Sequence, residues 1–218
     1  MHKSFPYKRA GRLYLEKFPF LHYQPHQENL PEAGCDEAGR GAYAGPVFAA
    51  AVILPSGFHH PLLNDSKLVS LLNRYALRDY IEKHAIAWAV AEVDQAEIDR
   101  INILRASFKA MHLAIGRLAL APAFLLIDGN RFSAYPDIPH QCVIGGDGLH
   151  APIAAASILA KTYRDDFMQG LHLQFPAYHW NSNKGYGTKA HRLAIAECGL
   201  CKYHRKSFSI WPAKPDLL

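Results

Sequence analysis

The sequence predicts an α/β domain in which a mixed β-sheet is flanked by helices. Three features indicate it. Residues 34–54 read as a short strand, a glycine-rich turn and a second, apolar strand. Apolar runs at 86–93, 123–128 and 141–144 add further strands, which gives a sheet of five. Stretches of helical length with helical periodicity lie between and after these runs.

Size and charge narrow the class of protein. The chain has 218 residues, half of them hydrophobic, so we expect one globular domain with at most a small appendage. It carries 24 Lys and Arg against 19 Asp and Glu, a net charge of +5, which suits a polyanionic partner. No apolar run of spanning length exists, and the basic start lacks a secretory apolar core. We therefore expect a cytoplasmic monomer without a membrane anchor.

The first half of the chain divides at proline and glycine. Residues 1–31 are aromatic and basic and predict an N-terminal arm interrupted by prolines. Strands are expected at 32–37 and 46–54, and a helix at 70–84 that begins after Ser66 or Ser70. A strand at 86–93 then leads into a short helix at 95–99, capped by Asp94, and a longer helix at 103–118.

The second half places strands before a long helix. Strands are expected up to Asp128 and at 141–144, separated by a loop with two prolines. The helix at 152–174 begins with small apolar residues that should be buried, and its more polar second half should emerge toward solvent. A loop at 177–187 precedes a final helix at 188–198, capped by Thr188.

Asp36 and Glu37 form an acidic pair at the end of the first strand. Adjacent carboxylates raise each other's pKa, and a divalent cation removes that cost. Oxygen ligands favour Mg²⁺ or Mn²⁺ over zinc. The alternative is a solvated acidic turn. Because neighbouring strand residues point to opposite faces, we expect Asp36 as the central ligand and Glu37 to reach in from the side.

Asp128 and Asp147 also follow strands. In open α/β sheets ligands bind beyond the strand ends. Four carboxylates at one edge predict a site for two divalent ions, although each turn taken singly could be an ordinary one. Gly39, Arg40 and Gly41 would let backbone N–H groups and a planar guanidinium approach a phosphate or a sugar.

The four cysteines show no disulfide spacing. Cys198 and Cys201, with His204, could hold a metal, but a lone CxxC is weak support. Thiols without a metal are the other interpretation.

These residues resemble the ribonuclease HII family, the type 2 ribonucleases H, over residues 32–208. The matching motifs are CDEAGRG at 35–41, AGPV at 44–47, NDSK at 64–67, IDGN at 127–130, GD at 146–147, AAASILAKTYRD at 154–165, KGYGT at 184–188 and HRKSF at 204–208.

The resemblance implies a ribonuclease H-like fold, with residues 32–170 as the catalytic domain and 171–218 as a helical region packed on it. It implies cleavage of RNA in RNA–DNA hybrids and on the 5′ side of single ribonucleotides in duplex DNA, in repair and replication. Two ions, Mn²⁺ or Mg²⁺, and products with a 3′-hydroxyl and a 5′-phosphate are expected.

Carried over by motif, the four acids bind the metals and act in catalysis, Gly39–Gly41 read the junction between ribonucleotide and deoxynucleotide, and Tyr186 packs on the sugar. One departure is Gly145, where the family usually has a lysine.

Several basic side chains are candidates for contacts to the nucleic-acid backbone, although each alone could be a solvated surface charge. Lys161 lies in an otherwise apolar helical segment, so we expect it to point into the site. The candidates are Lys67, Arg74, Lys161, Arg164 and Lys184.

Three alternatives remain open. The sister enzyme ribonuclease HIII has an extra N-terminal domain, for which 31 residues are too few. A hybrid-binding protein without catalysis would need a missing acid. A metal-dependent phosphatase could share such a sheet.

The final Asp216-Leu217-Leu218 could make a weak contact with a replication clamp.

Overall fold

The computed structural model describes residues 30–64 and 66–210. The expected N-terminal arm, apart from its last two residues, and the C-terminal Asp216-Leu217-Leu218 lie outside the described residues. Within the described part, no helix has both the length and the apolar character needed to cross a bilayer.

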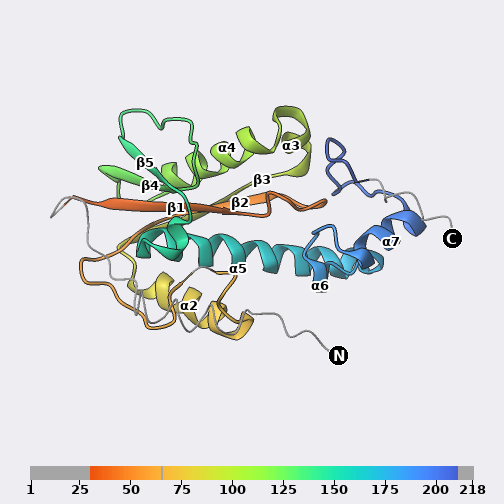
Figure 1. Cartoon of the computed structure of the whole chain (residues 1–218), viewed down its shortest axis with the longest axis horizontal. Coiled ribbons are helices and arrows are strands. Elements are labelled where there is room, and N and C mark those ends of the chain that lie inside the picture. Colours follow the sequence, from red (N-terminus) through yellow and green to blue (C-terminus); the bar gives the residue numbers. More distant parts are fainter. Residues whose placement is uncertain (1–29, 65, 211–218) are drawn as a thin grey trace, which may run out of the picture.

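A five-stranded mixed sheet forms the centre of the molecule, as the sequence predicts (Figure 1). Its spatial order is β3-β2-β1-β4-β5, with β1 antiparallel to β2, β2 antiparallel to β3, and β1, β4 and β5 mutually parallel. The strands are β1 (Glu32–Ala38), β2 (Val47–Ile53), β3 (Ala87–Val93), β4 (Phe124–Asp128) and β5 (His140–Val143).

Alternation along the strands gives the sheet two apolar faces. On one face Cys35, Ala51 and Ile127 pack in the core beneath α4 (Ile103–Gly116). On the other face Ala50 and Val52 pack against α5 (Ala151–Gln174) and α2 (Leu71–His84). Figure 1 shows α4, with the short α3 (Gln95–Ile101), on one side of the sheet and α5 and α2 on the opposite side.

Side-chain caps begin the helices where the sequence predicts. Ser70 accepts a hydrogen bond from the Asn73 N–H at the start of α2, and Asp94 accepts one from the Glu97 N–H at the start of α3. Thr188 caps α7 (Lys189–Cys198) in the same way. The predicted helix ends agree with the structure to within two residues.

The second half of α5 emerges toward solvent on one face only: Asp166, Gln169 and Leu173 are exposed, but the opposite face is covered. Its polar residues Arg164 and Asp165 are buried, together with Met168 and Leu171. The cause is the segment expected to be a loop, which folds back over α5 with Trp180 completely buried. That segment forms two turns of helix, η2 (Pro176–Tyr178) and α6 (Trp180–Asn183). Figure 1 shows α6 and α7 beside the C-terminal half of α5.

Candidate active site

Strand register brings two of the predicted acids together. In the parallel pair of β1 and β4, Cys35 lies opposite Ile127, so the next residues along, Asp36 and Asp128, are neighbours. Strand alternation turns both away from the α4 face and toward α5. Asp128 accepts a hydrogen bond of 2.8 Å from the Gly146 N–H, which links β4 to the turn after β5.

Glu37 reaches the same place from the end of β1. Strict alternation would send its side chain to the opposite face from Asp36. Both carboxylates nevertheless line one cavity, since Glu37 is the penultimate residue of the strand. Its Oε1 accepts a hydrogen bond of 3.1 Å from the Arg40 guanidinium. Arg40, expected to face a phosphate, is therefore paired with an acid of the site in this state.

Asp147 lies in η1 (Gly146–Gly148), directly after β5, and is buried. Gly145 precedes it with φ +66°, a left-handed conformation that glycine adopts at little cost. The charge that the family usually places at position 145 is absent, but Lys67 Nζ lies 3.7 Å from Asp147 Oδ2. A cation from another segment therefore stands beside the fourth acid.

A cavity of about 480 Å³ lies beside Asp36, Glu37 and Asp128, and Asp147 is not among the residues that line it. Its floor is α5, where Ser157 and Lys161 are one helical turn apart and so share a face. The full lining is Asp36, Glu37, Ala38, Gly39, Arg40, Gly41, Ser66, Lys67, Asp128, Ser157, Lys161 and Tyr186.

Burial and mutual repulsion act strongly on the paired acids. The pKa of Asp36 is raised well above its ordinary value, first by burial and then by the charges of Glu37 and Asp128. Burial also raises the pKa of Glu37, which the Arg40 charge partly offsets. Both carboxylates are thus held in a place where negative charge is unfavourable without a nearby cation.

The donor set fits hard divalent cations. It consists of carboxylate oxygens, which Mg²⁺ and Mn²⁺ prefer, and it lies where a positive charge would relieve the repulsion at Asp36. Among residues 30–64 and 66–210 no group of three or more Asp, Glu, His or Cys side chains is already gathered as a metal cage. Lys67 and Arg40 instead pair with two of the acids.

Two loops form the wall of the cavity. The connection between β1 and β2 forms isolated bridges with the C-terminal region, at Ala42 with Tyr186 and at Ala44 with His204. Tyr186 lines the cavity, and its hydroxyl has no hydrogen-bond partner among the described residues. A side chain at Gly41 would meet open space.

Gly39 has a second reason to be glycine besides the expected freedom of its backbone. Its φ is +97°, and a Cβ there would lie 2.0 Å from Nε of the buried Arg164. The missing side chain therefore makes room for a guanidinium of this chain. The sequence could not show this, because Arg164 is 125 residues away.

The basic candidates separate into two groups. Lys67 and Lys161 line the cavity, and Lys161 also pairs with the buried Asp165. The other three lie elsewhere. The Lys184 ammonium donates to the Asn181 carbonyl. Arg74 Nη1 lies 3.9 Å from Asp165 Oδ2, and Arg164 is completely buried. A direct contact from Arg164 to a phosphate, as the sequence suggested, is excluded by its burial in this structure.

The structure adds site residues that sequence analysis missed. Ser66 and Ser157 line the cavity and share a hydrogen bond of 2.9 Å, and Ser157 acts on the Asp36 carboxyl. Ser157 could have been identified from the sequence, because it lies four residues, about one helical turn, before Lys161. Arg205 lies in the HRKSF motif at 204–208, but nothing in the sequence indicated that it donates to the Arg40 and Gly45 carbonyls.

The possible metal site at Cys198 and Cys201 is not assembled. His204 uses both ring nitrogens inside the protein: Nδ1 accepts from the Cys201 N–H, and Nε2 lies 3.2 Å from His191 Nε2. Cys198 is exposed while His204 is buried. This arrangement leaves no ring nitrogen for a metal and favours the interpretation as ordinary thiols.

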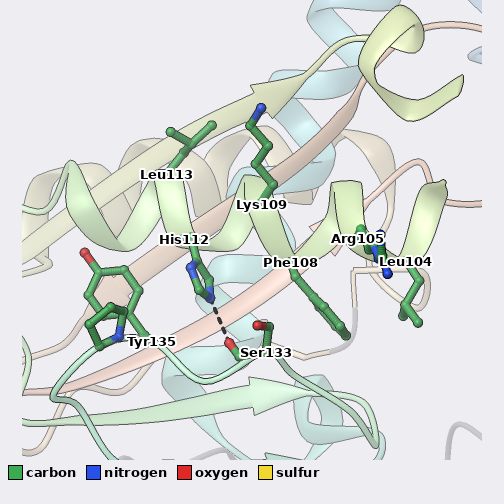
Figure 2. Close-up of a pocket in the computed structure, with 9 residues that line it drawn as sticks. Leu104, Arg105, Phe108, Lys109, His112, Leu113, Ser133 and Tyr135 are labelled. Atoms are coloured by element: carbon green, nitrogen blue, oxygen red, sulfur yellow. Dashed lines mark hydrogen bonds between the residues drawn. The ribbon is translucent and has the colours of Figure 1, made fainter. Parts of the chain in front are cut away.

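A larger cavity of about 770 Å³ lies on the other face of the sheet, between α4 and the loop after β4. Figure 2 shows Phe108, His112 and Tyr135 around it, with His112 hydrogen-bonded to the Ser133 carbonyl. Its lining contains no carboxylate. It therefore lacks the carboxylate oxygens that Mg²⁺ and Mn²⁺ prefer, and the smaller acidic cavity is the candidate active site.

Comparison with known proteins identifies the family of the chain. The sequence model of the family described as Ribonuclease HII matches residues 33–210. A ribonuclease HII from Parabacteroides distasonis is 64% identical over 186 residues, which cover 85% of this chain and 94% of that protein. Similar folds occur in the RNase HII of a PCNA:RNase HII complex from Archaeoglobus fulgidus (TM-score 0.69, 23% identity, 87% of this chain and 98% of that one) and in Bst-RNase HIII in complex with Mn²⁺ (0.62, 18%, 83% and 68%).

Proposed function

Because this chain belongs to the ribonuclease HII family, and is thus a nuclease that hydrolyses RNA in RNA–DNA hybrids, we propose that it also cuts on the 5′ side of single ribonucleotides in duplex DNA. The observation that supports this proposal is the cavity in which Asp36, Glu37 and Asp128 meet the loop of Gly39–Gly41 and Tyr186. It places candidate metal ligands beside groups that can contact a sugar.

We assign Asp36, Glu37, Asp128 and Asp147 as ligands of two divalent ions. Ribonucleases H depend on divalent metals, and the bound Mn²⁺ of the HIII structure supports Mn²⁺, with Mg²⁺ as the other candidate. When bound, such ions lower the pKa of water and stabilise the departing 3′ oxygen. Asp36 lies beside both Glu37 and Asp128, so it would be the ligand that the two ions share.

The remaining groups position the substrate. The amides of Gly39–Gly41 and the Tyr186 hydroxyl would read the 2′-hydroxyl at the junction, which both donates and accepts. Lys67 and Lys161 would contact phosphates in the cavity. Lys184, two residues before Tyr186 in the sequence, would contact a phosphate farther along the strand. The products would carry a 3′-hydroxyl and a 5′-phosphate.

The decisive experiment is cleavage of a labelled DNA duplex with one internal ribonucleotide, with Mg²⁺, with Mn²⁺ and with chelator. We expect a metal-dependent cut on the 5′ side of the ribonucleotide and none in the all-DNA duplex. Cleavage of a long hybrid without cleavage of this duplex would leave the family activity intact and refute the junction proposal.

Replacing Tyr186 by Phe tests the sugar-reading role. The hydroxyl has no partner among the described residues, so its loss leaves no polar group of the chain unpaired. We expect kcat/KM at the embedded ribonucleotide to fall about three- to tenfold, the value of one neutral hydrogen bond, with an unchanged melting temperature. Equal kcat/KM values for Tyr186→Phe and wild type would remove this residue from recognition.

Replacing Lys67 by Gln tests the phosphate contact. Each lost phosphate contact should reduce the slope of log Kd against log salt by about 0.9. We expect that change for Lys67→Gln, measured by binding of the duplex without turnover. Lys109→Gln is the control, since Lys109 is exposed on α4 and pairs with Glu97. The same slope in both variants would contradict the assignment.

The alternatives are not favoured. The family that matches residues 33–210 and the relative from Parabacteroides distasonis are both named ribonuclease HII, not the sister enzyme ribonuclease HIII. A catalytically silent hybrid-binding protein would need a missing acid, whereas all four are present. We further propose a monomeric cytoplasmic enzyme of ribonucleotide repair and replication, with residues 32–170 as the catalytic unit and 171–218 as a helical region packed on it.

A further inference from the structure

Two arginines lie completely buried beneath the loop that connects β1 and β2. They are Arg164 on α5 and Arg205 after α7. Within the described part of the chain, neither has a carboxylate at ion-pair distance. Buried cations without a counter-charge are costly unless other groups satisfy them, so their hydrogen bonds indicate what they are for.

Their partners are backbone carbonyls of the two loops that wall the active site. Arg205 donates from Nη1 to the Arg40 carbonyl at 2.8 Å and from Nε to the Gly45 carbonyl at 3.0 Å. Arg164 donates to the carbonyls of Ala44 (3.2 Å), Pro46 (3.1 Å) and Lys184 (2.9 Å). The guanidinium groups therefore draw the carbonyls of this loop inward.

The contact at Arg40 sets the direction of the next N–H. In a planar trans peptide the C=O and the N–H point in opposite directions, and no peptide bond among the described residues is cis. With the Arg40 carbonyl directed into the protein at Arg205, the Gly41 N–H is directed outward. Gly41 lines the acidic cavity, has open space on its side-chain side, and finds no acceptor for its N–H among the described residues.

The positive charge of Arg205 acts on the same peptide group that its hydrogen bond orients. Burial, and then the neighbouring Arg164, lower the pKa of Arg205 to about 9, and its Nη2 is buried without a partner. A cation held on a carbonyl polarises the peptide group, so its N–H becomes a stronger donor. An uncharged residue could hold the loop at a lower desolvation cost.

We propose that Arg205, supported by Arg164, is a positioning residue for ribose recognition. It holds the Arg40–Gly41 peptide so that the Gly41 N–H faces the 2′-oxygen of the ribonucleotide at the junction. This inference rests on the proposed function, because it assigns the donor with which the enzyme distinguishes a ribonucleotide from a deoxynucleotide.

The first test compares affinities for two duplexes, one with a single ribonucleotide and one of DNA alone, in an Asp147→Asn background that prevents cleavage. Lysine keeps the charge but lacks the fork that reaches two carbonyls. We expect Arg205→Lys to reduce the ribonucleotide preference about tenfold, with unchanged affinity for the all-DNA duplex. Arg117→Lys is the control, since Arg117, an exposed residue after α4, also donates to a carbonyl, that of Val90, and does not line the acidic cavity.

A second measurement needs no change at Arg205. The dipeptide Arg-Gly occurs once in the sequence, at Arg40-Gly41. A chain labelled with ¹³C-carbonyl arginine and ¹⁵N-glycine therefore gives one carbonyl-correlated amide signal, that of Gly41. We expect this signal to shift with the ribonucleotide duplex and to stay near its free position with the all-DNA duplex at equal saturation.

The outcomes separate the two levels of the argument. If the Asp147→Asn protein binds both duplexes equally, the junction proposal fails. If it prefers the ribonucleotide but the Gly41 signal does not distinguish the duplexes, the inference about Arg205 is overturned while the function stands. A preference that Arg205→Lys retains in full, in a folded variant, also overturns it.

Discussion

Asp36→Asn is expected to reduce cleavage by at least ~10³-fold while making the metal-free protein more stable. One shared metal ligand supports several kcal/mol of transition-state stabilisation, and each 1.36 kcal/mol is a factor of ten in rate. In the metal-free chain the same carboxylate is unfavourable, because burial and the charges of Glu37 and Asp128 raise its pKa. Asparagine keeps the shape and removes the charge.

The gain in stability has a defined pH dependence. A carboxyl group whose pKa is higher in the folded than in the unfolded state stabilises the fold fully below the unfolded value. That contribution is lost as the pH rises through the raised folded value. The unfolding free energy of metal-free wild type should therefore fall from about pH 4 upward, and Asp36→Asn should lack that part of the decrease.

The measurements are cleavage of the ribonucleotide duplex and thermal melting with chelator, with and without added Mn²⁺. We expect the melting temperature of the variant in chelator to rise by ~2–4 °C, which corresponds to ~1 kcal/mol in a chain of this size. Mn²⁺ should stabilise wild type more than the variant. Asp79→Asn, at an exposed position on α2, is the control. Full activity of Asp36→Asn would remove Asp36 from the metal site.

Gly34→Ala is expected to prevent accumulation of folded protein. A Cβ at Gly34 would lie 2.1 Å from the Pro152 carbonyl carbon and 2.3 Å from the Ile153 nitrogen, both backbone atoms of α5. Backbone cannot rotate out of the way as a side chain can, so strand and helix must separate. Overpacking in a core costs about 1–3 kcal/mol and occasionally more, and we expect ~3 kcal/mol or more here.

The control lies in the same helix. Gly170 of α5 has open space around its missing side chain, and Ala is a better helix former than Gly by about 0.5–1 kcal/mol. Gly170→Ala should therefore raise the midpoint of urea unfolding while Gly34→Ala abolishes or strongly lowers it. A Gly34→Ala protein that unfolds at the wild-type midpoint would show that α5 need not approach β1 so closely.

The sequence was most informative where the signal is local. The strands were predicted from apolar runs, and the helix starts at Ser70, Asp94 and Thr188 from capping residues, because these depend on nearby residues. The pairing of Asp36 with Asp128 was also predictable, since strands that end in acids at one sheet edge must bring them together.

The errors lie where distant segments decide burial. The second half of α5 has a polar sequence, yet Trp180 and its neighbours cover one face of it, and no local sequence pattern predicts that contact. Arg164 is of a residue type that usually lies at the surface, and its burial beside Gly39 depends on the approach of two segments that are distant in the sequence. Likewise, the approach of Lys67 to Asp147 joins segments 80 residues apart and leaves no periodicity to read.

The hydrogen bond from Arg205 to the Arg40 carbonyl spans 165 residues. On the ribosome the chain emerges from its N-terminus at about 5–20 residues per second. The loop of Gly39–Gly41 is therefore made early and must wait on the order of ten seconds for the arginine that orients it. During that time the strands can pair, but the loop lacks the hydrogen bond from Arg205. If Arg205 has the role proposed above, a nascent chain stalled before it would carry the four acids without the hydrogen bond that orients the Arg40–Gly41 peptide, and selectivity for a ribonucleotide would arise after the acids have been synthesised.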